Sequence, residues 1–380
     1  MIKVCLVSPY SYKLFHQENE NLPPFGGAEV QQYLLGKELA EDENFNISFI
    51  VGNFYKEQPK QEEINLNGHV INLYKTIKCK NRNCFLDFVM DFWFLYQGMK
   101  NTSADIFIIR GGGSLAGKVA IVTKYLLKKI YIYSSAHDRE SDSNFSKINS
   151  WLVNTLFMYA LNNADTVICQ HQDQQKKIQQ NLKIDATVFK TMYPLNKELL
   201  LFNPSLRGYI LWVGRLVDFK QPELFFNLAK HFPKEKFLLI SNSDKTILEE
   251  TIKNHNNVEI LKNVPFEKMD DYFRKAKIFV NTSTQEGFPN TFVQAAKNGV
   301  PICSLNVNPD GMLDKYNIGY CATGEMKKLI NNATAILHDT DKWQRMSQDA
   351  FKYAEENHNI KSIVKEYKLL FKTLYSQQCG

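Results

Sequence analysis

Residues 278–301 place a carboxylate beside a predicted anion-binding site. The apolar start of this stretch predicts a buried strand, and the helical pattern that follows ends in Asn-Gly, a helix stop signal. Pro289 has no N–H, so Asn290 and Thr291 are expected to supply the free amide donors of the first helical turn, where anionic oxygens bind well. Glu286 stands just before that turn. A carboxylate there suits a ligand with both phosphates and hydroxyls, such as a nucleotide sugar; a solvated cap in an ordinary strand–loop–helix is the alternative.

Two basic residues follow another predicted strand, Tyr209–Val213. Gly214 leaves the backbone free to turn at the end of that strand. Arg215 offers a planar fork of donors and Lys220 a point charge, a pair suited to clamping a diphosphate. Basic residues after a strand are also typical of a solvated loop.

Three loops in the first half of the chain follow predicted strands as well. Gly26-Gly27 at a helix start suits close backbone approach to a phosphate, although such a pair is often only a turn. His137 follows the strand at 130–134, where a histidine can donate to a sugar hydroxyl or a phosphate; a loop histidine is also commonly a surface residue. The run 110–114 (RGGGS) is interpreted either as lining for an acceptor or as a tight turn.

These motifs together resemble glycosyltransferase family 4, retaining enzymes with the GT-B fold. The resemblance rests on EGFPN followed by a helix and NGVP, on GGAE, on His-Asp, and on Gly-Arg…Lys. It implies that Glu286 contacts the transferred sugar and that His137 touches the same sugar. The resemblance implies catalytic roles for Glu286, His137, Arg215 and Lys220, and donor binding by Gly26, Gly27, Gly214, Arg215, Lys220, Glu286, Phe288, Asn290, Thr291 and Gln294.

The chain departs from the family pattern at two places. Gln294 stands where the family has a second glutamate that binds the ribose hydroxyls. An amide can still hydrogen-bond a hydroxyl, but without the charge that strengthens such bonds, so weaker ribose binding is expected. Residues 308–311 (NPDG) replace paired glycines, which alters the loop on the donor side.

Strands and helical patterns alternate through two similar halves of the 380 residues, more than one usual core holds. With the resemblance, this predicts an α/β chain of the GT-B class: two Rossmann-like, doubly wound parallel-sheet domains facing a central cleft. The expected parts are an acceptor domain at 1–192, a nucleotide-sugar donor domain at 207–355, and a C-terminal helix at 356–380 that crosses back to the first domain.

Composition excludes several classes of protein. Hydrophobic residues make up 44% and charged residues 23%, as in a globular chain. A net charge of +6 does not by itself indicate nucleic acid. The seven scattered cysteines contain no Cys-x-x-Cys and predict reduced thiols in the cytoplasm. The N-terminus has no signal-peptide pattern and no apolar run is long enough to span a membrane.

Residues 75–130 carry ten Lys or Arg against three acidic residues. Within them, the aromatic segment 85–96 is apolar all round. A core helix and a helix that partly enters an anionic lipid interface are both open interpretations.

The expected activity is retaining, metal-independent transfer of a hexosyl group from a UDP- or GDP-type sugar, with no cofactor. The expected acceptor is a glycan or lipid-linked acceptor in cell-envelope polysaccharide synthesis, such as lipopolysaccharide. The expected location is cytoplasmic, including peripheral contact with the inner face of the plasma membrane. Asp339-Thr340-Asp341 is interpreted as a helix start and not as a metal site. The alternatives are a non-catalytic subunit that binds nucleotide sugar or polysaccharide, or an epimerase or phosphorylase of the same fold.

Overall fold

The computed structural model describes residues 1–56, 58–78, 85–141, 150–196, 202–242 and 255–379. The chain divides into two compact units. Unit 1 comprises Met1–Met192 and Ile360–Gly380, and unit 2 comprises Tyr193–Asn359. Residues 197–201, between the two expected domains, lie outside the described residues, as do Lys80 and Arg82 of the basic stretch 75–130.

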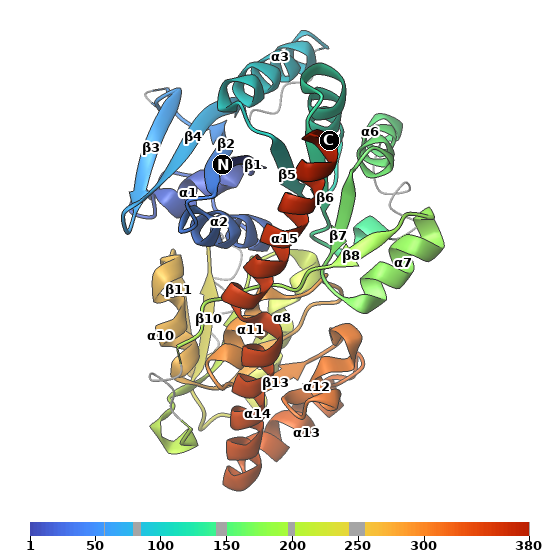
Figure 1. Ribbon diagram of the computed structural model, residues 1–380. Coiled ribbons are helices and arrows are strands. Elements are labelled where there is room, and N and C mark those ends of the chain that lie inside the picture. The colour runs from blue at the N-terminus through green and yellow to red at the C-terminus, as the bar shows by residue number, and fades with distance from the viewer. Residues whose placement is uncertain (57, 79–84, 142–149, 197–201, 243–254, 380) are drawn as a thin grey trace. The chain divides into compact units, whose positions relative to one another are not determined.

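Unit 1 contains an eight-stranded sheet in the order β3-β4-β2-β1-β5-β6-β7-β8 (Figure 1). Its inner strands are almost continuously apolar, as expected for parallel strands covered on both faces. Neighbouring strands of this sheet run parallel, except that β3 is antiparallel to β4. The strands are β1 Ile2–Val7, β2 Phe45–Asn53, β3 Gln61–Leu66, β4 His69–Lys78, β5 Ile106–Arg110, β6 Ile130–Ser134, β7 Thr166–Cys169 and β8 Ala186–Val188.

The path of the chain reverses at β1. From β1 it runs to β2 and then β4 on one side, and β5 then begins the series on the other side. The crevice beyond the carboxyl ends of β1 and β5 is therefore the topological switch point of unit 1, the usual place for a ligand in such sheets. Val7 pairs with Ile109 and Arg110 with Ser134, so the three neighbouring strands end at the same level.

Helices cover both faces of this sheet. The final helix packs against α2 and β6 and belongs to unit 1 (Figure 1). This helix begins at Ile360, whereas the sequence placed the start of the C-terminal helix at 356. The preceding helix, α14, continues to His358. The helices are α1 Tyr12–Phe15, α2 Gly27–Ala40, α3 Phe85–Thr102, α4 Ser114–Ile121, α6 Trp151–Asn162, α7 Gln172–Leu182 and α15 Ile360–Cys379. A π-helix, η2 Val122–Leu127, continues α4, and η1 Pro9–Ser11 and η3 Asp138–Ser141 are short 3-10 helices.

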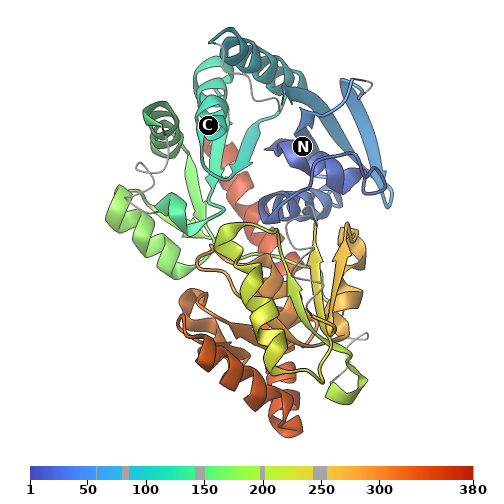
Figure 2. The ribbon, with the colours of Figure 1, turned by 180° about the vertical axis from the view of Figure 1, so that it is seen from behind.

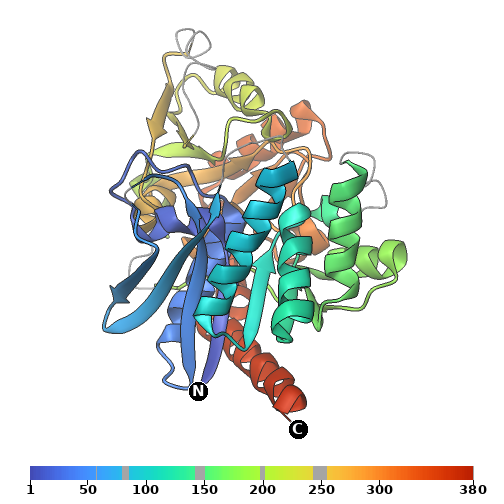
Figure 3. The same cartoon turned by 90° about the horizontal axis from the view of Figure 1, so that it is seen from above.

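The aromatic helix α3 has two different sides. Leu95 and Met99 are buried in the core of unit 1, whereas Trp93 and Phe94 are exposed. Figure 3 shows α3, α4 and α6 side by side, and α4 packs against α6 while α3 contacts η2. Exposed apolar residues lie on these neighbours too: Tyr125 and Leu126 on η2, and Trp151 and Leu152 on α6.

Unit 2 contains a six-stranded parallel sheet in the order β11-β10-β9-β12-β13-β14, with α8 against one face (Figure 2). Its strands are β9 Tyr209–Val213, β10 Phe237–Ser241, β11 Val258–Lys262, β12 Ala276–Asn281, β13 Ile302–Ser304 and β14 Gly319–Cys321. Its helices are α8 Pro222–His231, α10 Met269–Arg274, α11 Asn290–Lys297, α12 Met312–Lys315, α13 Met326–Leu337 and α14 Thr340–His358, with turns η5 Pro204–Leu206, η6 Asp218–Lys220, η8 Phe266–Lys268 and η9 Pro309–Gly311.

Asp339 begins α14 as the sequence predicts. Its carboxylate accepts a hydrogen bond from the amide of Lys342 at 2.9 Å, which satisfies one donor of the first turn.

Candidate functional site

Two loops of unit 2 meet at its own switch point. The chain runs from β9 outward to β10 and β11, and β12 then returns to pair with the other side of β9. The loop after β9 carries Gly214, Arg215 and Lys220, and the loop after β12 carries Glu286. The predicted diphosphate clamp and the predicted sugar-binding carboxylate therefore lie at the same edge of one sheet.

Lys220 and Glu286 form an ion pair there. The Lys220 Nζ donates to Oε1 of Glu286 at 2.6 Å, and both side chains are largely buried. The same oxygen accepts from the Ser283 hydroxyl at 2.7 Å and from the Asn281 amide at 3.0 Å. No hydrogen bond to Oε2 is recorded within the described residues, so this oxygen is the one placed to receive a ligand hydroxyl.

Hydrogen bonds between the two loops hold this pair in place. The Thr282 hydroxyl donates to the carbonyl of Lys220 at 2.6 Å and accepts from the indole N–H of Trp212 at 2.9 Å. The amide of Thr284 donates to the carbonyl of Phe219 at 2.8 Å. Because Trp212 is on β9, these contacts fix the Lys220 backbone to both strands and make the ion pair a preorganised feature.

Opposing effects set the ionisation of Glu286. Burial by itself raises the pKa of this carboxyl, since it disfavours the charged form. The Lys220 ammonium, Ser283 and Asn281 outweigh burial, and the pKa of Glu286 lies below its ordinary value. The carboxylate is therefore ionised near neutral pH and can only accept hydrogen bonds, which suits sugar hydroxyls.

Arg215 is exposed and its guanidinium makes no hydrogen bond or ion pair within the described residues. Gly214, just before it, donates its amide to the carbonyl of Ile240 at 3.1 Å. A Cβ on Gly214 would come within 2.9 Å of the Trp212 ring, so the tight turn that leads to Arg215 needs glycine. Arg215 is thus free to reach an anionic ligand at no cost in existing contacts.

Helix α11 begins at Asn290, as predicted, with Pro289 as its N-cap and no side chain capping it. Asn290 and Thr291 are the first two helical residues, whose amides have no intrahelical acceptor. Gln294, one turn along, is 6% exposed, and its side-chain amide makes no hydrogen bond within the described residues. Phe288 is buried with its ring centroid 5.0 Å from that of His358, so packing accounts for this residue.

The altered loop at 308–311 is a short turn with left-handed backbone at Asp310 and Gly311. The Asn308 side chain accepts from the amide of Leu313 at 3.0 Å and donates to Asp314 at 2.8 Å. Asn308 therefore ties this turn to the start of α12.

In unit 1, Gly26 and Gly27 stand at the start of α2. The amide of Gly26 donates to Oε2 of Glu29 at 2.8 Å, a capping interaction that already uses one of the expected phosphate donors. Glu29 was not singled out in the sequence, although a glutamate three residues into a helix is a signal for such a cap.

His137 lies in the turn after β6, and its Nδ1 accepts from the amide of Arg139 at 3.1 Å. This assigns the ring proton to Nε2. The neighbouring Asp138 accepts from His171 Nε2 at 3.0 Å, from Gln174 at 3.1 Å and from Lys177 at 3.2 Å. Burial opposes ionisation of Asp138, but His171 and Lys177 outweigh it and its pKa is lowered.

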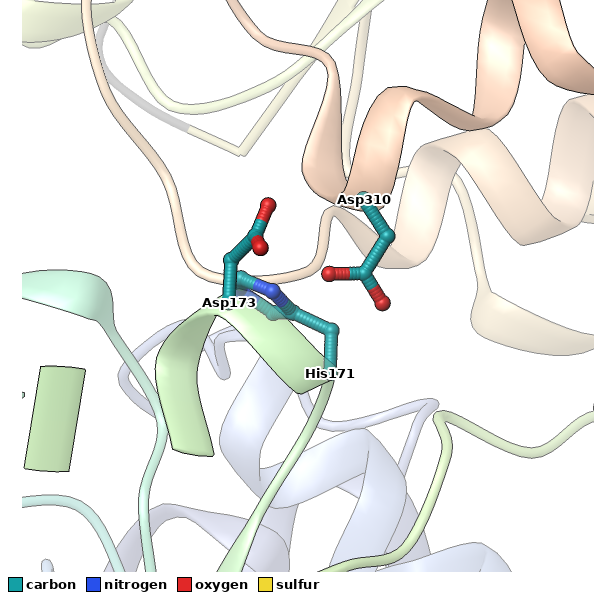
Figure 4. Close-up of side chains that lie close together, drawn as sticks. All are labelled: His171, Asp173 and Asp310. Carbon is teal, nitrogen blue, oxygen red and sulfur yellow. The ribbon is translucent and has the colours of Figure 1, made fainter. Parts of the chain in front are cut away.

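His171 also accepts at Nδ1 from the amide of Gln174 and so caps α7. Figure 4 shows His171 and Asp173 at the start of this helix. The potential ligand atoms of these two residues lie close together, but two ligands do not make a metal centre. Asp310, the third labelled residue, belongs to unit 2.

Glu140 organises the loops of unit 1, and sequence reasoning missed it. Its Oε2 accepts from the Tyr133 hydroxyl, the Ser135 hydroxyl and the amide of Ala136, each at 2.8 Å, and its Oε1 accepts from the amide of Gly112 at 2.9 Å. One carboxylate thereby joins the loop after β5 to the loop that presents His137. An acid three residues past the His-Asp pair carries no local signal of this role.

The family model described as "Glycosyl transferases group 1" matches residues 207–339 of this chain, within unit 2. An uncharacterised glycosyltransferase of Haemophilus influenzae is 24% identical over 59% of this chain, and the match spans 66% of that relative, just under two thirds of its length. Another, of Methanocaldococcus jannaschii, is 22% identical over 93% of this chain and 96% of the relative. A poly(glycerol-phosphate) alpha-glucosyltransferase of Bacillus subtilis is 27% identical over 45% of this chain and 27% of its own length.

Solved structures share the fold over nearly the whole chain. Sucrose-phosphate synthase from Thermosynechococcus elongatus superposes with a TM-score of 0.78 at 14% identity, covering 99% of this chain and 100% of that one. TarM of S. aureus, in complex with UDP among other ligands, gives 0.70 at 10% identity over 98% and 100%. WaaG, a glycosyltransferase involved in lipopolysaccharide biosynthesis, gives 0.68 at 11% identity over 96% and 98%. The fold is GT-B, and the comparisons support a glycosyltransferase.

Proposed function

We propose that the protein is a retaining glycosyltransferase that moves a hexosyl group from a UDP- or GDP-type sugar to a glycan or lipid-linked acceptor of the cell envelope. The observation that carries this proposal is the buried Lys220–Glu286 pair at the switch point of the segment that the glycosyltransferase model matches. Arg215 lies on the same loop as Lys220, and its guanidinium has no hydrogen bond or ion pair among the described residues. Two cations and a hydroxyl-binding carboxylate are the groups that a sugar diphosphate requires.

In the proposed reaction, the bond between the anomeric carbon and the distal phosphate oxygen breaks, and the nucleoside diphosphate leaves with the electron pair. Arg215 and Lys220 meet the charge that develops on this leaving group, helped by the first amides of α11. Because these cations neutralise the diphosphate, the proposed mechanism is independent of a metal ion.

The acceptor hydroxyl attacks the same face of the sugar, and its proton passes to an oxygen of the departing phosphate. The products are the glycoside and the nucleoside diphosphate, with the configuration retained. Glu286 and His137 hold the hydroxyls of the transferred sugar, and Gln294 binds the ribose. The proposed donor-binding set also keeps Gly26 and Gly27 on the diphosphate side.

The proposed site of action is a cytoplasmic, anionic membrane face. In the described part of the chain, no helix is both long enough and apolar enough to cross a bilayer. The exposed apolar residues of α3, η2 and α6 include Trp93 at 56% and Trp151 at 79% exposure, and Lys100 and Lys128 are exposed on the same elements or at their ends. Aromatic and basic side chains together suit attachment to anionic lipid. Among the described residues, the thiols of Cys5, Cys303 and Cys321 form no disulfide, as expected for a protein of the cytoplasm.

The envelope role is supported by two similar proteins, one a poly(glycerol-phosphate) alpha-glucosyltransferase and the other a glycosyltransferase involved in lipopolysaccharide biosynthesis. Gln294 favours one alternative, a non-catalytic subunit that binds nucleotide sugar. A thermal-shift screen of nucleoside diphosphates, followed by assays of donor hydrolysis and transfer, separates the two. Stabilisation together with slow hydrolysis supports the enzyme; stabilisation without hydrolysis or transfer supports the subunit; turnover of donor to an epimer or a phosphate-dependent reaction supports the remaining alternatives.

A further inference from the structure

The switch point of unit 1 carries a cation that the proposed donor chemistry does not use. Arg110 is the last residue of β5, next to the carboxyl end of β1. In each unit the chain first builds the sheet on one side of its first strand and then returns to the other side, to β5 in unit 1 and to β12 in unit 2. Arg110 at the end of β5 therefore corresponds in position to the start of the loop after β12. In unit 2 this location holds a paired carboxylate; in unit 1 it holds an arginine.

The Arg110 guanidinium lacks the partners that a half-buried cation normally has. Its only hydrogen bond within the described residues is from Nη1 to the Ser134 hydroxyl at 3.4 Å, and its buried Nε has no hydrogen-bond partner there. No carboxylate of the described chain lies within 4 Å of it. Leaving such a group unpaired disfavours the folded state unless a ligand supplies the missing acceptors.

Arg207, in unit 2, shows how this chain treats a structural buried arginine. Its Nη1 donates to the carbonyl of Ala276 at 3.0 Å, and its Nη2 donates to those of Asn298 and Gly299 at 3.1 and 3.2 Å. Its guanidinium also lies 4.8 Å from the Trp343 ring. Arg110 donates to no backbone carbonyl within the described residues. A structural role of the kind that Arg207 has therefore does not explain why an arginine stands at this position.

The acids around Arg110 are already committed to other donors. Glu140 accepts from four neutral groups of the adjacent loops, and Glu29 accepts from the amide of Gly26. Burial lowers the pKa of Arg110, while Tyr367, Glu140, Tyr133 and Glu29 act in the opposite direction. An arginine stays protonated under these conditions, so a positive charge with free donors remains.

The loop that follows Arg110 is uncrowded at Gly113. Gly113 closes the loop after β5 with φ of 112°, and a Cβ placed there would meet nothing within 4 Å. The positive φ explains the glycine, and the free volume leaves room for a ligand group near the end of β5.

We propose that Arg110 binds an oxyanion of the acceptor, a phosphate or a carboxylate, and so selects an acidic acceptor. This inference rests on the proposed transferase function, because it names the acceptor class of that reaction. A guanidinium binds both anions through two parallel N–H donors, and a neutral sugar offers no equivalent partner.

Ligand-observed NMR titration with glucose 6-phosphate, glucuronate and glucose tests the inference in the full chain. The parent should bind at least one of the two acidic sugars ten or more times as tightly as glucose. Arg110→Gln should weaken binding of the acidic sugars about tenfold or more and leave glucose unchanged, as expected for loss of a charged hydrogen bond. Arg110→Lys should be intermediate, and it serves in place of the glutamine variant if that variant does not fold. A preference for only one of the acidic sugars identifies whether phosphate or carboxylate is the natural group.

Arg215→Gln is the matched control, because the diphosphate clamp could also attract an acidic sugar. It should weaken nucleoside diphosphate binding and leave the acidic sugars unaffected, the reverse of Arg110→Gln. The inference is overturned if the parent does not prefer the acidic sugars, if Arg110→Gln or Arg110→Lys binds them as the parent does, or if only Arg215→Gln loses them. Absence of nucleoside diphosphate binding would overturn the proposed function instead.

Discussion

The Nζ of Lys220 lies 2.6 Å from Oε1 of Glu286, although 65 residues separate the two in the chain. The sequence resemblance gave these residues different tasks, one on the diphosphate and one on the sugar. Their contact couples the two tasks. A diphosphate that draws Lys220 away would leave Oε1 of Glu286 held by Ser283 and Asn281, with Oε2 still open to a sugar hydroxyl.

Arg215→Ala should cut turnover roughly a hundredfold while leaving stability within about 0.5 kcal/mol. The exposed side chain makes no hydrogen bond or ion pair within the described residues that its removal would break, yet it is placed to meet developing negative charge. Steady-state kinetics and denaturant unfolding measure the two effects. Lys234→Ala, another exposed cation of unit 2, should change neither. Kinetics within threefold of the parent would remove Arg215 from the diphosphate site.

Lys220→Ala should lower both turnover and stability. It removes a cation from the leaving group, and it also leaves the Glu286 carboxylate buried without its counterion, at a cost of about 3 kcal/mol. The double variant Lys220→Ala, Glu286→Gln should recover most of that stability but no activity. A single variant as stable as the parent would show that the ion pair does not form in solution.

The lowered pKa of Glu286 predicts a pH dependence of stability. A carboxyl whose folded pKa is depressed stabilises the fold above its unfolded pKa, about 4.3, and loses this contribution as pH falls through the folded pKa. The difference in Tm between the parent and Glu286→Gln should therefore be constant from pH 6 to 8 and shrink below pH 4. A difference that grows on acidification would reverse the assigned direction.

Gln294→Glu should tighten nucleotide binding by about 1 kcal/mol, because a charged acceptor strengthens a hydrogen bond to a ribose hydroxyl. The free protein should become less stable, since the new carboxylate is buried without a recorded partner. Titration calorimetry of the nucleoside diphosphate measures the affinity, and Gln294→Ala provides the baseline. Weaker binding by the glutamate variant would move the ribose contact to another residue.

Vesicle flotation tests the proposed membrane surface. Binding should need anionic lipid and fall with salt, and it should weaken in Trp93→Ala and Trp151→Ala, which remove exposed aromatic area. Lys100→Gln and Lys128→Gln should each cost about 1 kcal/mol of binding. Leu369→Ala, a change at an exposed apolar residue of α15, is the matched control. If the parent ignores anionic vesicles at low salt, the lipid proposal fails.

Most buried strands were predictable because they are short continuous apolar runs. Strand β3 was missed because its alternating pattern marks an edge strand, where only part of the surface is covered. A signal was present: Asn67-Gly68 is a two-residue hairpin turn with φ of 54° and 92°, and it makes β3 antiparallel to β4. Strands β8 and β14, of three residues each, are too short for any period to appear.

The candidate site was predictable as a set of residues but not as a set of contacts. Motifs identified Lys220 and Glu286 separately, but their contact follows only from the placement of β12 beside β9. Asn281 and Ser283 lie within five residues of Glu286, and their hydrogen bonds to it follow from the path of the loop after β12. The unpaired state of Arg110 likewise depends on where Glu29 and Glu140 direct their carboxylates. These hydrogen bonds depend on the order of the strands and on the path of the loops, which the spacing of residues in the sequence does not reveal.

The account's central claim is that unit 2 binds a nucleotide sugar through Arg215, Lys220 and Glu286 and releases the nucleoside diphosphate. The most direct test measures the release of nucleoside diphosphate from a panel of UDP- and GDP-sugars by the parent and by Arg215→Ala. The Tm of the two proteins is compared first, so that a loss of activity is not due to unfolding. The account predicts release from at least one donor by the parent and a loss of roughly a hundredfold in the variant. Equal rates in the two proteins, or no release from any donor in the presence of acidic acceptors and anionic vesicles, would contradict it.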